Sequence, residues 1–187
     1  MPASVVVAKN RLLLVALGFI VVANLLPADL MEFNRPAILG GQLWRLWTGQ
    51  FCHWSTLHLA GNLAAIAGLA LVAGKPICRW LVLLPVAAPL LSLFLLATTP
   101  EMEHYRGLSG LVAMLVVGAA VEGGTIGWIL AIAWIGKLTF DIFSGTPSPL
   151  LPDGIVTSWQ SHVGGLLLGL LAAAGFRLRD TRKPSRP

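Results

Sequence analysis

The sequence is poor in charge. Only 11% of its 187 residues are charged, whereas 56% are hydrophobic and the mean hydropathy is +0.80. A soluble globular domain carries about 25% charged residues, so the composition excludes one and indicates a protein embedded in a lipid bilayer. The net charge is +5, but the cations form no aromatic-rich basic patch, and we expect no nucleic-acid partner.

Cysteines and potential metal ligands are also few. Cys52 and Cys78 flank one hydrophobic segment, so we expect them on opposite sides of the bilayer, without a disulfide. His53, His58 and His104 could suggest a metal site. However, His53 and His58 are five residues apart and share a helix face poorly, and no cysteine or carboxylate has ligand spacing with them. We therefore expect neither a metal nor a cofactor.

Six hydrophobic segments are candidate membrane spans, each of which needs about 20 apolar residues. They cover residues of about 12–26, 57–73, 80–97, 109–121, 125–140 and 161–176. The first resembles a signal peptide but has no convincing cleavage site, so we expect a retained helix. The fourth is short, which suits a helix whose polar start lies below the membrane surface. The sequence predicts one all-α membrane domain over residues 1–187, a six-transmembrane-helix bundle with a basic tail at 177–187.

The positive charges orient this bundle. Six spans place both termini on one side, together with nine cations: Lys9, Arg11, Lys75, Arg79, Arg177, Arg179, Arg182, Lys183 and Arg186. The other side holds three: Arg35, Arg45 and Arg106. The positive-inside rule therefore predicts cytoplasmic termini, and the compact form suits a multi-pass protein of a bacterial inner membrane. The periplasmic loop at about 142–160 is not expected to be helical throughout, because it contains Gly145, Pro147, Pro149, Pro152 and Gly154.

Two chemically capable residues stand at the heads of hydrophobic segments. Ser109 lies in Gly107-Leu108-Ser109-Gly110, and His162 opens the last segment. A polar residue in hydrocarbon is costly, and a serine with a histidine can act as a nucleophile and its base. Both residues begin helices that run inward from the outer side, so they share a depth. Taken singly, the serine could be a helix N-cap and the histidine a satisfied core residue.

Small residues allow these two helices to approach closely. Gly165 and Gly169 form one face of the last helix, and Gly110 and Ala113 are small positions on the fourth. The first N–H groups of a helix have no internal partner, so the backbone of Ser109 could bind an oxyanion.

Further hydrogen-bond donors come from the second hydrophobic segment. His58 and Asn62 are four residues apart and share a helix face near its outer end. Their N–H groups could complete an oxyanion site. The alternative for Asn62 is that it only joins helices through a hydrogen bond.

The fifth segment contains an opposite-charge pair. Lys137 and Asp141 are four residues apart, with Lys137 about 6 Å deeper. The structural interpretation is a self-neutralising pair near the membrane boundary, and the functional one is a polar wall facing substrate or gate. Asp153, the acidic residue nearest to His162, lies in a loop and is not assigned to a catalytic triad.

Together these motifs resemble the rhomboid family of intramembrane serine proteases. The matching pieces are Trp44-Arg45, His58-x-x-x-Asn62, Gly107-Leu108-Ser109-Gly110 and His162-x-x-Gly165. The resemblance implies a Ser109–His162 dyad without an acidic third member, and an oxyanion site of the Ser109 backbone, His58 and Asn62. It also implies that Arg45 holds the first outer loop in shape and that the loop before the last helix is a gate. The partners would be membrane-anchored protein substrates.

A narrower resemblance comes from Tyr105-Arg106-Gly107-Leu108-Ser109-Gly110 and the minimal six-helix body, which are similar to rhombosortase. This bacterial subfamily implies substrates with a C-terminal Gly-Gly motif, a hydrophobic helix and a basic tail. The alternatives are a rhomboid protease with other substrates, and a non-catalytic rhomboid-like protein that binds membrane helices. A transporter or channel fits less well, because no span carries repeated charges.

Overall fold

The structure is a computed structural model that describes residues 3–144 and 148–181. Within this part of the chain, the long helices are α1 (Ala3–Ala23), α5 (Thr56–Ala73), α7 (Leu84–Thr98), α8 (Ser109–Glu122), α9 (Gly124–Ser144) and α10 (Trp159–Thr181). The short elements are α2 (Ala28–Met31), β1 (Phe33–Asn34), α3 (Arg35–Leu39), α4 (Arg45–Thr48), α6 (Ile77–Leu81) and β2 (His104–Tyr105). The predicted helical architecture is confirmed. Gly145, Pro147, Arg182, Lys183 and Arg186 lie outside the described residues.

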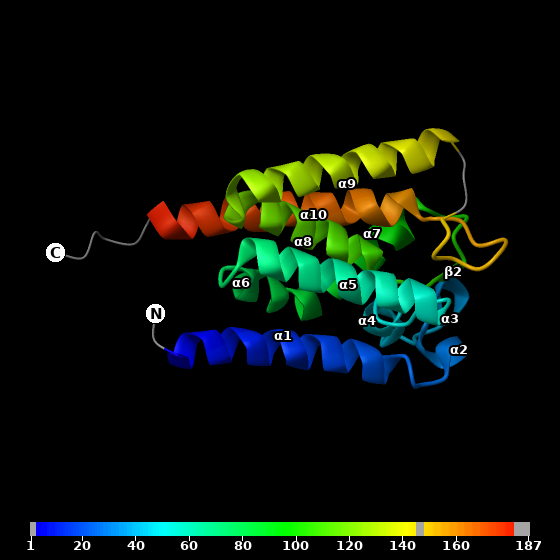
Figure 1. Ribbon diagram of the computed structural model, residues 1–187. Helices are drawn as coiled ribbons and strands as arrows, with labels where there is room; N and C mark the ends of the chain where they lie inside the picture. Colours follow the sequence, from blue (N-terminus) through cyan, green and yellow to red (C-terminus); the bar gives the residue numbers. More distant parts are fainter. Residues whose placement is uncertain (1–2, 145–147, 182–187) are drawn as a thin grey trace.

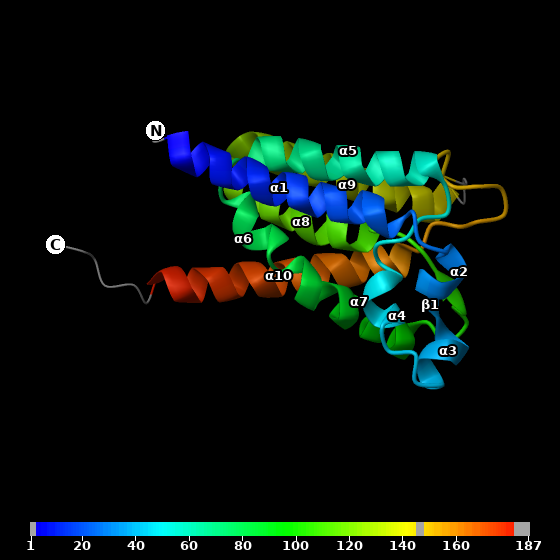
Figure 2. The same ribbon diagram turned by 90° about the horizontal axis from the view of Figure 1, so that it is seen from below.

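The long helices form a bundle around α8 (Figures 1 and 2). The start of α1 and the end of α10 lie at one end, which we name the terminal end (Figure 1). The short elements α2, α3 and α4 and the small sheet lie at the other, which we name the loop end (Figure 1). Among the described helices, α5, α9 and α10 are long and apolar enough to cross a membrane, and Arg11–Ala23, α7 and α8 are shorter apolar helices. These helices make the chain an integral membrane protein.

The predicted third segment is not one helix. Instead, α6 ends at Leu81 and α7 begins at Leu84, with Pro85 in its first turn. Proline has no N–H to donate and is tolerated in a first turn, so it starts a new helix rather than continuing the old one. The prediction of a continuous helix from residue 80 was therefore wrong at its start.

Other predicted ends shift by a few residues. Helix α1 ends at Ala23, before the predicted 26, and α9 continues to Ser144, beyond 140. The last helix is longer at both ends, so Arg177 and Arg179 of the predicted tail still belong to α10. Cys52 and Cys78 are both free thiols.

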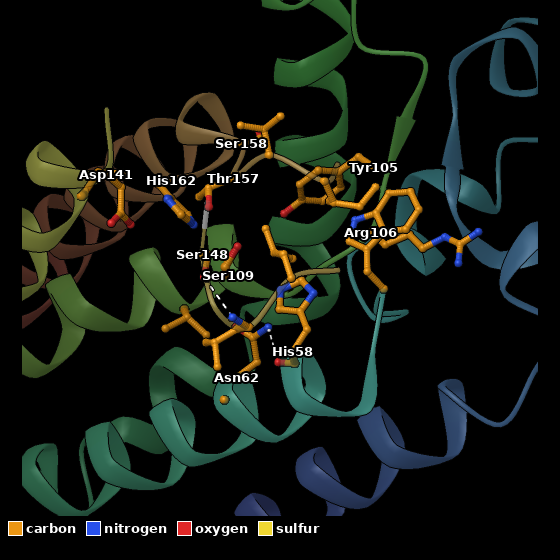
Figure 3. A pocket seen from close by; sticks show the side chains of 18 of the residues that line it. His58, Asn62, Tyr105, Arg106, Ser109, Asp141, Ser148, Thr157, Ser158 and His162 are labelled. Carbon is orange, nitrogen blue, oxygen red and sulfur yellow. Dashed lines mark hydrogen bonds between the residues drawn. The ribbon is translucent and has the colours of Figure 1, made fainter. Parts of the chain in front are cut away.

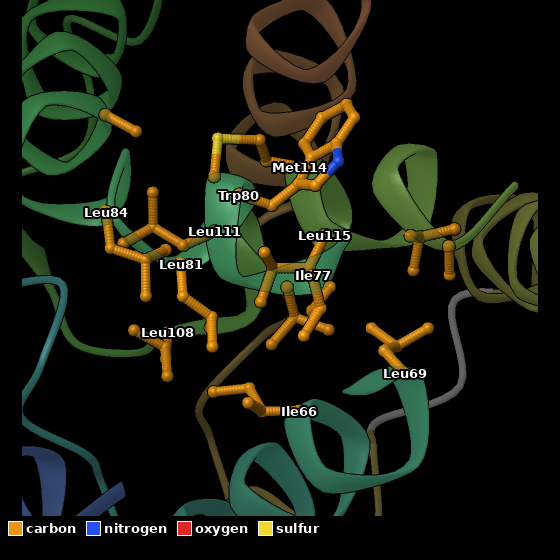
Figure 4. Packing of buried hydrophobic residues seen from close by; sticks show 14 of the residues in the cluster. Ile66, Leu69, Ile77, Trp80, Leu81, Leu84, Leu108, Leu111, Met114 and Leu115 are labelled. Carbon is orange, nitrogen blue, oxygen red and sulfur yellow. The ribbon is translucent and has the colours of Figure 1, made fainter. Parts of the chain in front are cut away.

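Helix α8 forms the centre of the core. It is apolar on all sides, as expected of a helix surrounded by protein. Leu108, which precedes it, and Leu111 are fully buried and pack in one cluster with Trp80 of α6 (Figure 4). Truncating such a leucine to alanine costs about 2–5 kcal/mol, so this cluster holds the start of α8 firmly in place.

The approach of α10 to α8 depends on glycine. A Cβ atom on Gly165 would collide with the carbonyl oxygen of Gly110 and lie 3.0 Å from Cβ of Ala113. A Cβ atom on Gly169 would lie 2.8 Å from Cβ of Val117. The structure thus brings together the small residues that the sequence analysis paired, and the two helices touch through their backbones.

The small sheet fixes the loop end. Strands β1 and β2 pair antiparallel, with Phe33 opposite Tyr105. The next residue, Arg35, donates side-chain hydrogen bonds to carbonyl oxygens at and beyond the end of α7: Leu95, Leu96, Thr99 and Met102. The last carbonyls of a helix need partners from outside it, so the arginine supplements the backbone bonds at this helix end and anchors β1 to α7.

Candidate active site

A pocket of about 750 Å³ opens at the loop end of the bundle. It is lined by α5, α8, α9 and α10 and by residues between 148 and 158. Ser109, His58, Asn62 and His162 all line it, and Figure 3 shows their side chains converging from three helices. The structure therefore brings together the four residues that the sequence analysis selected for their chemistry.

Ser109 is the first residue of α8 and is half-buried. It follows a tight backbone turn at Gly107, where φ is +142°. The N–H of Gly107 donates to the carbonyl oxygen of Gly49 at 3.3 Å. A Cβ atom on Gly107 would lie 2.8 Å from Cε1 of His58, so both the conformation and the space require glycine here. The turn presents the free N–H of Ser109 at a helix N-terminus, where negative charge is stabilised.

His58 and Asn62 project from the first turns of α5. Ser55 caps this helix by accepting a hydrogen bond from the backbone N–H of His58 at 3.0 Å. The Asn62 side-chain amide donates to the carbonyl oxygen of His58 at 3.2 Å. One amide hydrogen of Asn62 therefore remains available to a ligand in the pocket.

His53 contacts His58, contrary to the prediction that the two would be poorly placed to meet. Their ring centroids lie 4.9 Å apart in an edge-to-face arrangement. The contact is possible because His53 lies in the loop before α5, so helical spacing does not apply. Among the described residues, no three His, Cys, Asp or Glu side chains lie close enough together to hold a metal ion.

The hydrogen bond between His53 and Asn24 shows which ring nitrogen of His53 carries the proton. The Asn24 amide nitrogen donates to the carbonyl oxygens of Ile20 at 2.7 Å and Phe51 at 2.8 Å. The Asn24 amide oxygen lies 3.1 Å from Nδ1 of His53, so Nδ1 carries the proton. Burial lowers the pKa of His53 to about 3, and the ring is neutral at physiological pH.

His162 lies in the first turn of α10 and is buried. Its ring packs edge-to-face against Trp134 of α9, with centroids 5.3 Å apart. Within the described part of the chain its Nδ1 has no hydrogen-bond partner, and no hydrogen bond joins it to Ser109. Figure 3 shows the Ser109 hydroxyl between His162 and Tyr105. Hydrogen bonds between catalytic groups are often long without substrate and tighten when it binds.

The loop before α10 covers the pocket. The Ser55 hydroxyl donates to the carbonyl oxygen of Leu150 at 3.1 Å. The Leu150 side chain lies against Gly61 of α5, where an added Cβ atom would be 2.8 Å away. Ser148, Thr157 and Ser158 add polar groups to the lining. These two contacts attach the described part of the loop to α5.

Charged groups of α9 line one side of the pocket. On α9, Lys137 and Asp141 form an ion pair and both line the pocket, which favours the interpretation as a polar wall. Asp153 is exposed and is not among the lining residues.

The outer side of the pocket contains residues that sequence reasoning missed. Glu32 is buried and accepts hydrogen bonds from Nε of Arg106 and Nδ1 of His104, both at 2.8 Å. The guanidinium of Arg106 also lies 4.4 Å above the Trp54 ring. The sequence analysis quoted Arg106 as part of the serine motif, but nothing in the sequence links it to Glu32.

Arg45 lies outside the pocket but holds the first loop together. It is buried, and its Nη1 donates to the carbonyl oxygens of Asp29 and Glu32 at 2.8 and 2.9 Å. Its Nε donates to the side chain of Gln42 at 2.8 Å. Its neighbour Trp44 is exposed and donates from its indole nitrogen to the carbonyl oxygen of Leu30 in α2 at 3.2 Å.

The comparison with protein families agrees with this architecture. The Rhomboid domain model matches residues 40–179, so the chain belongs to the rhomboid family. Members of this family are intramembrane serine proteases. A search of curated proteins finds no match.

Proposed function

We propose that the protein is an intramembrane serine endopeptidase in which Ser109 and His162 form the catalytic dyad. The observation that carries this proposal is one pocket that holds Ser109, the first residue of α8, together with the buried His162 and the donors His58 and Asn62. Ser109 Oγ attacks the peptide carbonyl while His162 takes the hydroxyl proton. The histidine then gives this proton to the leaving amine, and water hydrolyses the acyl-enzyme.

The oxyanion of the tetrahedral intermediate would lie at the start of α8. The N–H of Ser109 is one donor, and the remaining amide hydrogen of Asn62 and the imidazole of His58 supply the others. One such donor lowers the barrier by about 3–4 kcal/mol. The glycine turn before Ser109 and the Ser55 cap of α5 support this role, because they hold the donors in fixed positions.

The substrates in this proposal are membrane-anchored proteins with a weak helix near the cleaved bond. A stable helix hides its carbonyl groups in its own hydrogen bonds, whereas a Gly-Gly segment exposes them. The motif Tyr105-Arg106-Gly107-Leu108-Ser109-Gly110 supports the rhombosortase subfamily and its Gly-Gly sorting tails.

The proposed topology has six spans, cytoplasmic termini and a pocket facing the periplasm of a bacterial inner membrane. The start of α1 and the end of α10 lie together at the terminal end, away from the pocket, which supports an even number of crossings (Figure 1). The cations near both termini support the cytoplasmic assignment of that end. Residues 148–158 would act as the gate that admits substrate and water, and Arg45 would keep the first loop in shape.

Labelling with a fluorescent fluorophosphonate tests the dyad. The experiment compares detergent-purified wild type with Ser109→Ala and His162→Ala. Labelling confined to wild type, with cleavage of a membrane-anchored Gly-Gly reporter by wild type alone, is the expected result. Cleavage by purified Ser109→Ala protein would disprove the mechanism.

One observation favours a second candidate. The missing hydrogen bond between Ser109 and His162 suits a non-catalytic rhomboid-like protein that binds membrane helices. For that candidate, wild type would capture the Gly-Gly reporter without cleaving it, and Ser109→Ala would bind it equally well.

A further inference from the structure

Tyr105 is the only tyrosine of the chain and lies beside the nucleophile. It belongs to β2, where it pairs with Phe33, and only 5% of its surface is exposed. Its hydroxyl donates a hydrogen bond to the carbonyl oxygen of Gly107 at 2.7 Å. Since the N–H of Gly107 is bound to Gly49, both polar groups of this glycine are fixed, one by the first loop and one by Tyr105.

The same hydroxyl also lies close to both helices of the proposed dyad. The Tyr105 oxygen interacts with the hydroxyls of Ser161 and Ser109 and with the backbone of Gly110. Ser161 directly precedes His162, and its own hydroxyl donates to the carbonyl oxygen of Ser158 at 2.7 Å. Figure 3 shows the Tyr105 side chain pointing into the space beside Ser109. One phenol therefore connects the turn before α8 with the start of α10.

The phenol remains protonated under ordinary conditions, because burial raises the pKa of Tyr105. Its single hydrogen is used by the Gly107 carbonyl, so toward Ser109 its oxygen can only accept. An acceptor beside Ser109 restricts the rotation of the serine hydroxyl before substrate binds. Because the serine has one hydrogen, this hydroxyl then turns from the phenol to His162, which takes the proton during attack.

We propose that Tyr105 is a positioning residue for the Ser109–His162 dyad, a role that rests on the proposed protease function. Its donation to Gly107 holds the turn that aims the Ser109 N–H into the pocket. Its oxygen keeps the Ser109 hydroxyl between the phenol and His162. The packing of the ring is separate from this role, because a phenylalanine at position 105 would fill the same space.

The test compares the full chain of wild type, Tyr105→Phe and Ser92→Ala in detergent. Ser92 is the control, since it is fully buried and away from the pocket lining. Its hydroxyl donates to the Leu46 carbonyl oxygen, also at 2.7 Å, and accepts from the Gln50 amide at 3.0 Å. The readouts are the melting temperature and the fluorophosphonate labelling kinetics, separated into the maximal rate kinact and the half-saturating concentration KI.

In Tyr105→Phe, kinact is expected to fall by about 10- to 100-fold, because a catalytic group displaced by about 1 Å loses activity on this order. KI should change by less than about twofold, since the pocket keeps its shape. Ser92→Ala should lose at least as much thermal stability as Tyr105→Phe, because it removes two buried hydrogen bonds, but it should keep the wild-type kinact. This difference separates positioning from a general loss of stability.

Two results would overturn the role of Tyr105 while leaving the protease intact. One is an active wild type with an equally active Tyr105→Phe. The other is a Tyr105→Phe protein that fails to fold, which would make the hydroxyl a structural requirement. A folded wild type that neither labels nor cleaves the Gly-Gly reporter would instead overturn the proposed function itself, and this proposal with it.

Discussion

The two ends of the bundle treat their buried polar groups differently. At the terminal end, Arg79 forms ion pairs with Glu122 and Asp180 and lies 4.5 Å above the Phe176 ring, while the Trp80 indole donates to Glu122. This cluster joins α6, α8 and α10. Each charged group in it has a partner, which is the usual condition of polar groups in a protein interior.

At the loop end, three buried ring nitrogens lack such partners among the described residues. Nε2 of His53, Nδ1 of His58 and Nδ1 of His162 have no hydrogen bond among the described residues. An unsatisfied buried group costs about 1–3 kcal/mol, so it persists only where something else is gained. The paired charges at the terminal end therefore stabilise the fold. The unpaired nitrogens at the loop end lower its stability, and those that line the pocket remain free to bind a ligand there.

Asn62→Ala gives the largest expected effect and addresses the loop end directly. Loss of one oxyanion donor should lower the cleavage rate by about 10²–10³-fold. The melting temperature should stay near the wild-type value, because the hydrogen bond that the Asn62 amide donates among the described residues goes to a carbonyl of its own helix. The cleavage rate of the Gly-Gly reporter and a thermal melt of the same preparation check this. Normal cleavage would mean that Asn62 is not an oxyanion donor.

Gly165→Ala tests the backbone contact between α8 and α10, the helices that extend between the two ends of the bundle. The added Cβ atom would collide with the carbonyl oxygen of Gly110, and overpacking of this kind costs up to about 3 kcal/mol. Gly175→Ala is the matched control on the same helix, because nothing lies within 4 Å of its added Cβ atom. The control should be neutral or stabilising by up to about 1 kcal/mol. Equal free energies of unfolding for the two variants would contradict the close contact of α8 and α10.

His53 predicts a pH dependence of stability at the loop end. Its pKa is about 3 in the folded protein and 6.5 when unperturbed, so below pH 6.5 the unfolded chain binds more protons. Its contribution is complete above about pH 6.5 and is lost as the pH falls toward 3. Between pH 7 and pH 5 this amounts to about 2 kcal/mol.

His53→Gln should therefore lose less stability than wild type between pH 7 and pH 5, as measured by chemical denaturation. His104→Gln is the control, because His104 is exposed and lies on the outer side of the pocket. Parallel stability curves for wild type and His53→Gln would show that His53 is not held neutral by burial.

The sequence analysis reached the residues whose signals are local. Ser109, His58 and Asn62 stand out because a polar side chain is costly in an apolar segment and therefore indicates a function. The helical period also predicts that His58 and Asn62 share one helix face. The break between α6 and α7 was missed, because apolar composition does not show where Pro85 ends one helix and starts another. Contacts between distant segments have no sequence period, so the Glu32–Arg106 pair could not be inferred. Tyr105 was visible as part of the serine motif, but its hydrogen bond to Gly107 depends on a strand pairing that only the structure gives.

Glu122→Gln gives the smallest expected effect and tests the terminal end. The substitution keeps the size of the side chain but removes the charge that pairs with Arg79. Because Arg79 is partly exposed, solvent screens the pair, and the loss should be about 1 kcal/mol in the free energy of unfolding. The cleavage rate should not change, since Glu122 lies at the opposite end of α8 from Ser109.

This last variant decides whether the two ends are independent. A lower melting temperature with unchanged fluorophosphonate labelling would support a division between a stabilising end and a reactive end. A loss of labelling larger than the loss of stability would mean that strain at the end of α8 reaches Ser109 through the helix. In that case α8 would transmit the strain along its length, and the packing of its Leu111 in one cluster with Trp80 would contribute to catalysis as well as to the core.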